Sequence, residues 1–175
     1  MTSVVLLLGG ECTGKTTLAR ELSTRIANRP VEVVPEVLRD FVARHDRTPQ
    51  RDEQAGIWRT QTELLDQAIA TSADNAVVIA DPAPLMTAVY SLQYFDDDSL
   101  LAPALAATQS GDLVVWCAPD LPWEPDGIQR DGPTARDATE RLLVTHIAPE
   151  LREVPVITVA GTSDERVAHV LAHLH

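Results

Sequence analysis

The sequence predicts an α/β protein of three layers, with helices on both sides of a five-stranded, mostly parallel sheet. Short apolar runs of strand length alternate along the chain with longer segments that have helical periodicity. These runs are apolar at consecutive positions, which is typical of parallel strands buried on both faces. The chain has 175 residues, 45% of them hydrophobic, so we expect one domain over residues 1–175 with a sizeable core.

Five segments are expected to be strands because they are short, apolar and rich in valine, leucine and isoleucine. They span residues 3–8, 31–34, 76–80, 113–116 and 156–159. Pro35 closes the second strand, and the pair Asp81-Pro82 closes the third. Proline cannot donate to a sheet ladder, so both positions are natural strand ends.

Between these strands, apolar residues recur at helical spacing. Leu18, Leu22 and Ile26 follow one another at intervals of four in the helix expected at 16–28. A long helix that ends near residue 69 has a stripe formed by Ile57, Leu64, Leu65 and Ala68. Further helices are expected at 36–44, after Pro82 as far as residue 94, at 99–107, and at 134–147 with Thr134 as N-cap. A last helix is expected at the C-terminus, where the apolar stripe is Val167, Val170, Leu171 and Leu174.

Composition excludes several classes of protein. The chain has 14 basic and 26 acidic residues, a formal net charge of −12, which argues against binding to a nucleic-acid backbone. No apolar run approaches membrane-spanning length, and no basic residues precede SVVLLL as a secretion signal requires. Cys12 and Cys117 form neither a disulfide framework nor a metal-binding spacing. We therefore expect a cytoplasmic protein with no membrane or nucleic-acid partner, and the sequence predicts no particular oligomeric state.

The strongest motif is GGECTGKT at residues 9–16, which matches G-x-x-x-x-G-K-S/T in full. It follows a buried strand and opens an amphipathic helix, so its backbone amides and the helix N-terminus can bind phosphates. Lys15 is the only lysine of the chain, and its compact ammonium is suited to bridging phosphates. A glycine-rich turn that binds nothing is the alternative. The residues predicted to bind the phosphates of ATP are Gly10, Glu11, Cys12, Thr13, Gly14, Lys15, Thr16 and Thr17.

Acidic residues follow two neighbouring strands and define the expected acceptor side. Asp81 is predicted to hold Mg²⁺ or its bound water together with the Thr16 hydroxyl, although a turn aspartate before proline is the simpler alternative. Glu36 is the expected base that takes a proton from an attacking hydroxyl, or it holds a sugar hydroxyl. A first-turn helix acid explains Glu36 equally well. Asp81 is the alternative base, and Arg39 and Gln61 complete the predicted acceptor pocket.

Residues 120–136 are rich in proline, glycine and charge and are expected to form a lid over the site. Arg130 and Arg136 lie on either side of Gly132 and Pro133 in an otherwise acidic protein. On a closing segment they can stabilise the charge of a transferred phosphoryl group. The alternative is a solvated loop in which the arginines are incidental. We count both as predicted catalytic residues, with Lys15, Glu36 and Asp81.

Four segments, GGECTGKTTLARELS, VVPEVLRDF, VVIADP and DLPWEPDGIQRDGPTAR, together resemble the ribosylnicotinamide kinase domain of the bacterial NAD-salvage regulator. They also resemble the related small P-loop ATPases and kinases of AAA type. The resemblance runs from Val4 to the helix after Arg136. It implies a P-loop NTPase fold of nucleoside-kinase type that binds ATP and Mg²⁺ and transfers the γ-phosphoryl group to a ribosyl 5′-hydroxyl.

By position, Glu36 and Arg39 match the acidic and basic pair on the acceptor side of that domain. Asp81 matches the first acid of its Asp-x-Asp motif, but this chain has Ala83 in place of the second. The lid arginine is displaced to Arg130. The acceptor therefore stays open between ribosylnicotinamide and another small hydroxylated metabolite or an antibiotic.

A nucleotide-switched regulatory ATPase with no acceptor is the alternative from a different class. A regulatory GTPase is disfavoured because its Asn-Lys-x-Asp base-reading motif needs a second lysine, and the chain has only one.

Overall fold

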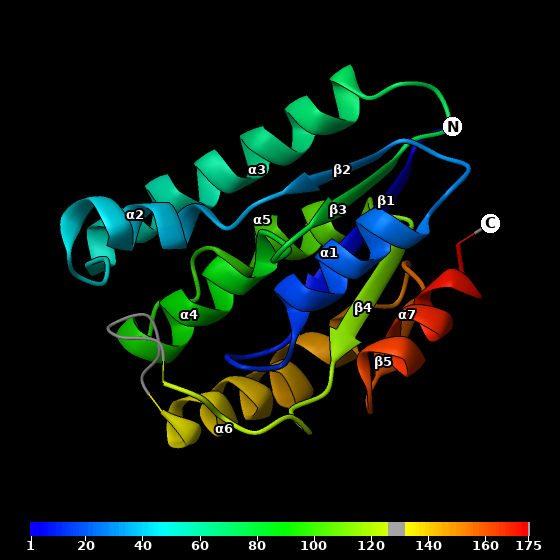
Figure 1. Cartoon of the computed structure of the whole chain (residues 1–175). Helices are drawn as coiled ribbons and strands as arrows, with labels where there is room; N and C mark the ends of the chain where they lie inside the picture. The colour runs from blue at the N-terminus through cyan, green and yellow to red at the C-terminus, as the bar shows by residue number, and fades with distance from the viewer. Residues whose placement is uncertain (126–131, 175) are drawn as a thin grey trace.

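A computed structural model of the chain describes residues 1–125 and 132–174. Within these residues, five strands form one parallel sheet in the order β2-β3-β1-β4-β5 (Figure 1). Their bounds are β1 (Ser3–Leu8), β2 (Val31–Val34), β3 (Val77–Ala80), β4 (Leu113–Cys117) and β5 (Val156–Val159). The predicted five-stranded parallel sheet is confirmed, and each strand lies within one residue of its predicted bounds.

The central strand β1 pairs with β3 on one side and with β4 on the other. Leu6 is opposite Ala80 of β3 and Val114 of β4. Because the strands are parallel, the turns that follow them meet at the same edge of the sheet, where α/β proteins bind their ligands. The phosphate motif after β1 therefore lies beside Asp81, which follows β3.

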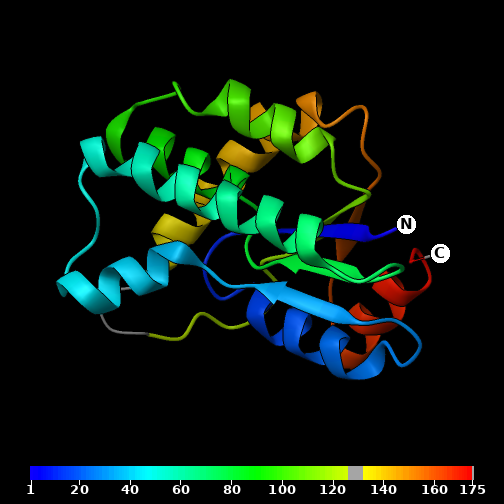
Figure 2. The same ribbon diagram turned by 90° about the horizontal axis from the view of Figure 1, so that it is seen from above.

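Helices cover both faces of the sheet (Figures 1 and 2). One face carries α1 (Lys15–Arg25) and α7 (Ser163–Leu171). The other carries α3 (Gln54–Thr71), α4 (Leu85–Phe95), α5 (Leu101–Gln109) and α6 (Pro133–Leu142), while α2 (Val37–His45) continues beyond the end of β2. Short helical turns lie at Arg51–Glu53, Leu143–Ile147 and Ala148–Glu150.

The two hydrophobic layers follow from the alternation of side chains along β1. Val5 and Leu7 pack with α1 and α7, whereas Leu6 and Leu8 pack with the helices of the opposite face. All four side chains are at most 1% exposed. Burying such a side chain stabilises the fold by about 1.5–3 kcal/mol. This burial on both sides is why the strand sequence is continuously apolar.

Several details differ from the sequence prediction, including the end of α1 at Arg25 before Ile26 and the exposure of Leu171 in α7. Leu64, expected in the buried stripe of α3, is 38% exposed, because the buried positions follow the spacing Ile57, Gln61, Leu65. The helix expected to begin with Thr134 as its cap instead has Pro133 as its first residue, a position where proline loses no hydrogen bond. Its α-helical part ends at Leu142, earlier than predicted, and continues as a π-helical turn.

Of the helices described, none combines the length and the hydrophobicity that crossing a bilayer requires.

Candidate functional site

The turn between β1 and α1 is compact and needs glycine at two positions. Gly9 has φ +136°, and a Cβ there would lie 2.7 Å from Thr13 Oγ1 and 2.8 Å from the Cys117 carbonyl oxygen. Gly14 has φ +81° and directly precedes α1. Thr13 Oγ1 donates to the Gly10 carbonyl oxygen at 2.9 Å. The glycine spacing of the motif is thus explained by left-handed backbone and close approach.

Lys15 is folded back onto this turn. Its Nζ donates to the carbonyl oxygens of Gly9 at 2.8 Å and Gly10 at 2.7 Å. The N-terminus of α1 has no side-chain cap, so its first amides remain available to an anion. A polyphosphate at this position would offer the ammonium stronger, charged acceptors than two carbonyl groups.

Seven of the eight residues predicted to bind phosphates line a cavity of about 1060 Å³; they are Glu11, Cys12, Thr13, Gly14, Lys15, Thr16 and Thr17. The eighth, Gly10, lies behind the turn, where its amide already donates to Glu140 Oε1 at 3.0 Å. This volume lies slightly above the usual range for small-molecule sites, about 300–1,000 Å³.

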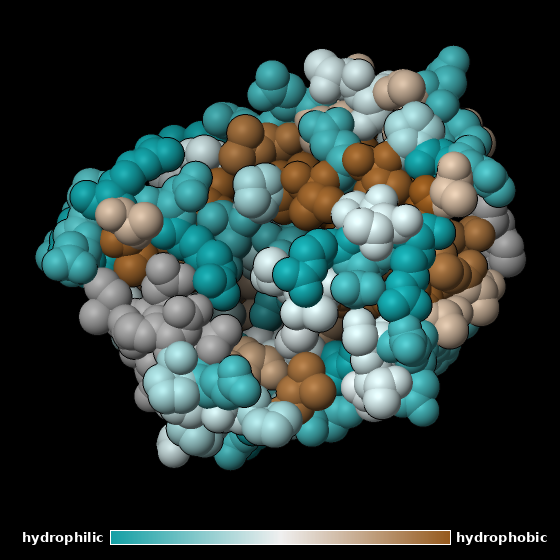
Figure 3. Space-filling view, in the orientation of Figure 1, coloured by the Kyte–Doolittle hydropathy of each residue, from teal (hydrophilic) through white to brown (hydrophobic). Residues whose placement is uncertain are grey.

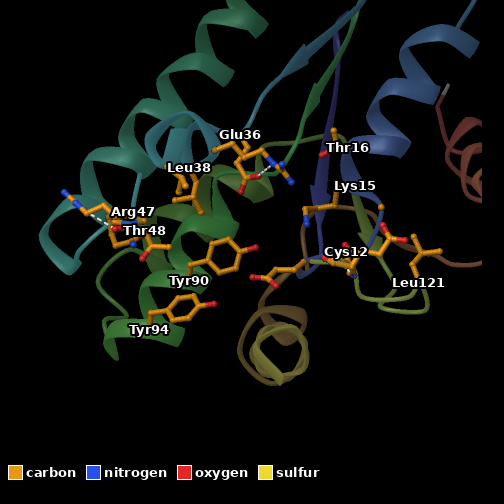
Figure 4. Close-up of a pocket in the computed structure, with 18 of the residues that line it drawn as sticks. Cys12, Lys15, Thr16, Glu36, Leu38, Arg47, Thr48, Tyr90, Tyr94 and Leu121 are labelled. Atoms are coloured by element: carbon orange, nitrogen blue, oxygen red, sulfur yellow. Dashed lines mark hydrogen bonds and ion pairs between the residues drawn. The ribbon is translucent and has the colours of Figure 1, made fainter. Parts of the chain in front are cut away.

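The opposite wall of the cavity is formed by α2, residues 47–50, the first residue of α3, and α4 (Figure 4). Tyr90 and Tyr94 project from α4 into the cavity, on the side away from the phosphate turn (Figure 4). The space-filling view shows the hollow on this face of the molecule, bordered mainly by hydrophilic side chains (Figure 3). The apolar and aromatic lining residues on this wall are Leu38, Val42, Pro49, Tyr90, Tyr94 and Phe95.

Glu36 lines the cavity from the N-terminus of α2, and its side chain is only 18% exposed. Arg39 Nε donates to Glu36 Oε2 at 3.1 Å, and Arg39 lines the cavity as well. Burial raises the pKa of Glu36, although the charges of Lys15 and Arg39 oppose the change. The predicted acceptor pair is therefore assembled, with a carboxyl group that accepts protons more readily than a solvated one.

Gln61 does not line the cavity. Its Oε1 accepts from the Val37 amide at 2.8 Å, and its Nε2 donates to the Pro35 carbonyl oxygen at 3.1 Å. The side chain thus fixes the two residues on either side of Glu36. Both ends of the amide are bonded to the backbone that flanks Glu36, and direct contact between Gln61 and an acceptor stays a prediction.

Asp81 is 6% exposed and lies directly after β3. Burial raises its pKa, and a hydrogen bond with Thr16 acts in the opposite direction. A hydroxyl group beside a carboxylate is a donor set suited to Mg²⁺. Among the described residues, no cluster of three or more His, Cys, Asp or Glu could hold a metal, so the pair fits an ion that takes its remaining ligands from phosphates and water. Ala83, which replaces the second acid, is fully buried.

The predicted lid residues lie in different places. Arg136 Nη1 donates to the Leu121 carbonyl oxygen at 2.8 Å, and Arg136 packs against the outer side of Gly10 instead of lining the cavity. Arg130 lies outside the described residues. The described start of the segment contacts the phosphate turn, because Trp123 Nε1 donates to Glu11 Oε2 at 3.2 Å.

Two residues that support the phosphate turn were missed by the sequence reasoning. Arg166, 3% exposed, donates through Nη1 to the Thr13 carbonyl oxygen at 2.8 Å and forms an ion pair with Asp120. Glu140 accepts from Gly10 through Oε1 and from Trp116 Nε1 through Oε2, the latter at 3.1 Å. Both contacts depend on the strand order β1-β4-β5, which no local sequence signal contains.

The chain belongs to the AAA domain family, whose sequence model matches residues 4–166. No curated protein matches it. The AAA-type part of the resemblance is therefore confirmed.

Solved structures share the fold. NadR in complex with NAD and AMP-PNP has a TM-score of 0.73 and 22% identity over 99% of this chain and 49% of NadR, so this chain spans about half of that protein. Thymidylate kinase from Candida albicans has a TM-score of 0.67 and 14% identity over 98% of this chain and 90% of the kinase. Deoxyadenosine kinase from M. mycoides has a TM-score of 0.66 and 12% identity over 99% and 98%. The predicted fold class, a P-loop fold of nucleoside-kinase type, is confirmed.

Proposed function

We propose that this protein is an ATP-dependent kinase that transfers the γ-phosphoryl group of ATP to a hydroxyl group of a small, nucleoside-like acceptor. One observation carries the proposal. The phosphate turn and the wall that holds Glu36 line the same cavity, so a phosphate donor and a hydroxyl acceptor can occupy it together. Phosphoryl transfer needs mainly such positioning and electrostatic stabilisation.

In this proposal each residue has a distinct task. Lys15 leaves the carbonyl groups of Gly9 and Gly10 and binds the phosphates with the amides of the turn. Thr16 and Asp81 hold Mg²⁺, directly or through water, and the ion neutralises charge on the β- and γ-phosphates.

Glu36 accepts the proton of the attacking hydroxyl group, and its raised pKa favours that step. Asp81 is the alternative base. Arg130 remains a proposed charge-stabilising residue.

Ribosylnicotinamide is one candidate acceptor, supported by the motifs around Glu36 and by the fold shared with NadR, which has been solved in complex with NR at 19% identity and a TM-score of 0.67. The buried alanine at position 83 is a difference from the resembled domain. Other small hydroxylated metabolites and antibiotics are therefore included as acceptors. We also propose that the protein acts in the cytoplasm, where its free cysteines, Cys12 and Cys117, remain reduced.

The test combines nucleotide titration with a turnover assay. Calorimetry with Mg²⁺ and ATP should show binding, and coupled ADP detection should show turnover that rises when an acceptor is added. The panel contains ribosylnicotinamide, common nucleosides, shikimate and an aminoglycoside. Equal, slow ADP formation with and without every acceptor would instead support a nucleotide-switched ATPase. No binding of ATP to folded protein would contradict both functions.

Two variants test the assigned roles. Lys15→Ala should weaken ATP binding by roughly 100-fold while the fold is retained, because charge-assisted hydrogen bonds to phosphate are lost. Glu36→Gln should keep ATP binding while transfer falls by about 10²–10⁴-fold. Asp40→Asn, a change at a 67% exposed side chain of the same helix, is the matched control. Unchanged transfer in Glu36→Gln would remove Glu36 from the role of base.

A further inference from the structure

Gln54, the first residue of α3, is 4% exposed and lines the cavity on the wall opposite the phosphate turn. No hydrogen bond within the described part of the chain involves its side-chain amide. The buried polar atoms without a partner in the described residues are Trp58 Nε1, Ser91 Oγ and Arg136 Nε, so the amide of Gln54 is not sealed off from the cavity. A side chain that is so little exposed, has no partner in the described protein and lines the cavity is available to a ligand there.

Gln61 provides an internal comparison. It lies seven residues later on the same face of α3 and is 2% exposed. Both ends of its amide are bonded to the backbone around Glu36. The helix thus buries two glutamines on one face, one satisfied by the protein and one directed to the cavity. A ligand that enters the cavity can supply the missing donor and acceptor for Gln54.

The surroundings of Gln54 define the chemistry of that ligand. The wall of the cavity that includes Gln54 also includes the apolar side chains of Val42 and Phe95. The preceding residue, Glu53, is bound by both terminal nitrogens of Arg47, at 2.7 Å and 2.8 Å, so these two charges neutralise each other. A charged group beside Gln54 would lose its hydration without gaining a counterion there. A neutral planar group with neighbouring donor and acceptor atoms matches an amide side chain.

We infer that Gln54 determines acceptor specificity by pairing with a neutral amide group, either a carboxamide or the amide edge of a nucleobase. The inference rests on the proposed kinase function and adds the part of the acceptor that is recognised. The hydroxyl end of the acceptor then lies toward Glu36 and Lys15, and the amide-bearing end lies toward α3.

The test compares Gln54→Met with the wild type. Binding of ribosylnicotinamide, its carboxylate analogue ribosylnicotinic acid, inosine and cytidine is measured by calorimetry in the presence of AMP-PNP and Mg²⁺, and thermal unfolding is measured without ligands. The wild type should bind at least one amide-bearing compound and should bind ribosylnicotinic acid more weakly than ribosylnicotinamide. Gln54→Met should weaken binding of the amide-bearing compound by about 10- to 100-fold, with AMP-PNP affinity unchanged.

The free Gln54→Met protein should unfold at about the same temperature as the wild type, because the substitution removes no hydrogen bond within the described part of the protein. Gln67→Met, an exposed position of the same helix, is the matched control and should change neither quantity.

The inference would be overturned by any of three results. These are a lower melting temperature of Gln54→Met than of the wild type, equal acceptor affinity in the two proteins, or equal binding of ribosylnicotinamide and ribosylnicotinic acid by the wild type. Failure of every amide-bearing compound to bind would overturn it as well. ADP formation with an acceptor that lacks an amide would leave the kinase function standing in each of these cases. Amide binding that depends on Gln54, without any phosphoryl transfer, would overturn the kinase proposal instead.

Discussion

Arg166 and Thr13 are joined by a hydrogen bond of 2.8 Å between a guanidinium nitrogen and a backbone carbonyl oxygen, although 153 positions separate them in the sequence. The same guanidinium donates through Nε to the Gly161 carbonyl oxygen at 3.0 Å. Helix α7 thereby holds the phosphate turn through the backbone of Thr13, which is itself fully buried.

Replacing Arg166 should disturb both stability and nucleotide binding. Arg166→Met leaves the carbonyl groups of Thr13 and Gly161 without their donor and removes the ion pair with Asp120, which then keeps its hydrogen bond from the Gly161 amide. We expect a loss of about 2 kcal/mol in the free energy of unfolding and a raised dissociation constant for ATP, measured by urea denaturation and calorimetry. Arg25→Met, which breaks a more exposed ion pair with Asp164, is the control and should leave ATP binding unchanged. Equal ATP affinity in Arg166→Met would contradict the supporting role.

Replacing Gln61 should reduce stability and also affect the acceptor side. Gln61→Met leaves the Val37 amide and the Pro35 carbonyl group without their partners, which should cost about 1–3 kcal/mol. Because these residues flank Glu36, kcat should fall while the KM for ATP stays constant. Gln67→Met on the exposed face serves as the control. A KM for the acceptor that rises with kcat unchanged would indicate direct acceptor contact instead.

The pKa of Glu36 makes stability depend on pH. Burial raises it above the ordinary value of 4.5, so between the ordinary and the raised pKa the folded protein holds a proton that the unfolded chain has released. Stability contributed by the neutral carboxyl group is complete below pH 4.5 and declines as the pH rises through this window. Glu36→Gln lacks that decline and should therefore exceed the wild type in melting temperature at pH 7.

The difference between Glu36→Gln and the wild type should shrink as the pH approaches 4, which thermal unfolding across pH 4–8 would measure. Asp40→Asn should follow the wild type throughout. A constant difference at all pH values would show that titration of Glu36 is not its cause.

The stability that Glu53 contributes depends on pH in the opposite direction. Hydrogen bonds from Arg47 lower its pKa to about 2. Its stabilising effect is present above the ordinary pKa of 4.5 and is lost as the pH falls toward 2. Glu53→Gln should therefore be less stable than the wild type at pH 6, by an amount that decreases on acidification below 4.5. Arg44→Met, which removes a longer pair of 3.7 Å with Asp40, provides the comparison. A deficit that persists unchanged to pH 3 would argue against the ion pair.

Features encoded locally could be predicted from the sequence. The strands were predicted because consecutive apolar residues suffice to identify a strand buried on both faces. The phosphate turn was predicted because its glycines, lysine and threonine are adjacent. The local pattern was insufficient at Leu64 and Leu65, because two adjacent residues of a helix cannot both lie at the centre of its buried face. Leu65 is buried and Leu64 is exposed, and the face that continues through Leu65 holds Gln61.

Contacts between distant segments could not be predicted. No sequence pattern identified Arg166 and Glu140 as supports of the phosphate turn. An arginine or glutamate on an amphipathic helix has the same local pattern whether it faces water or that turn. Gln54 was equally hidden, since its significance depends on the absence of a partner in three dimensions. Glu36 and Asp81 could be proposed because each directly follows a strand, and the ends of parallel strands meet at one edge.

The support of Thr13 by Arg166 has a consequence for synthesis on the ribosome. A nascent chain that has emerged only as far as β4 contains the entire phosphate motif but neither Gly161 nor Arg166. The turn then lacks its buried donor, so the ATP binding proposed above should not stabilise the growing chain at this stage. Nucleotide present in the cell would act as a folding aid only after translation has passed α7.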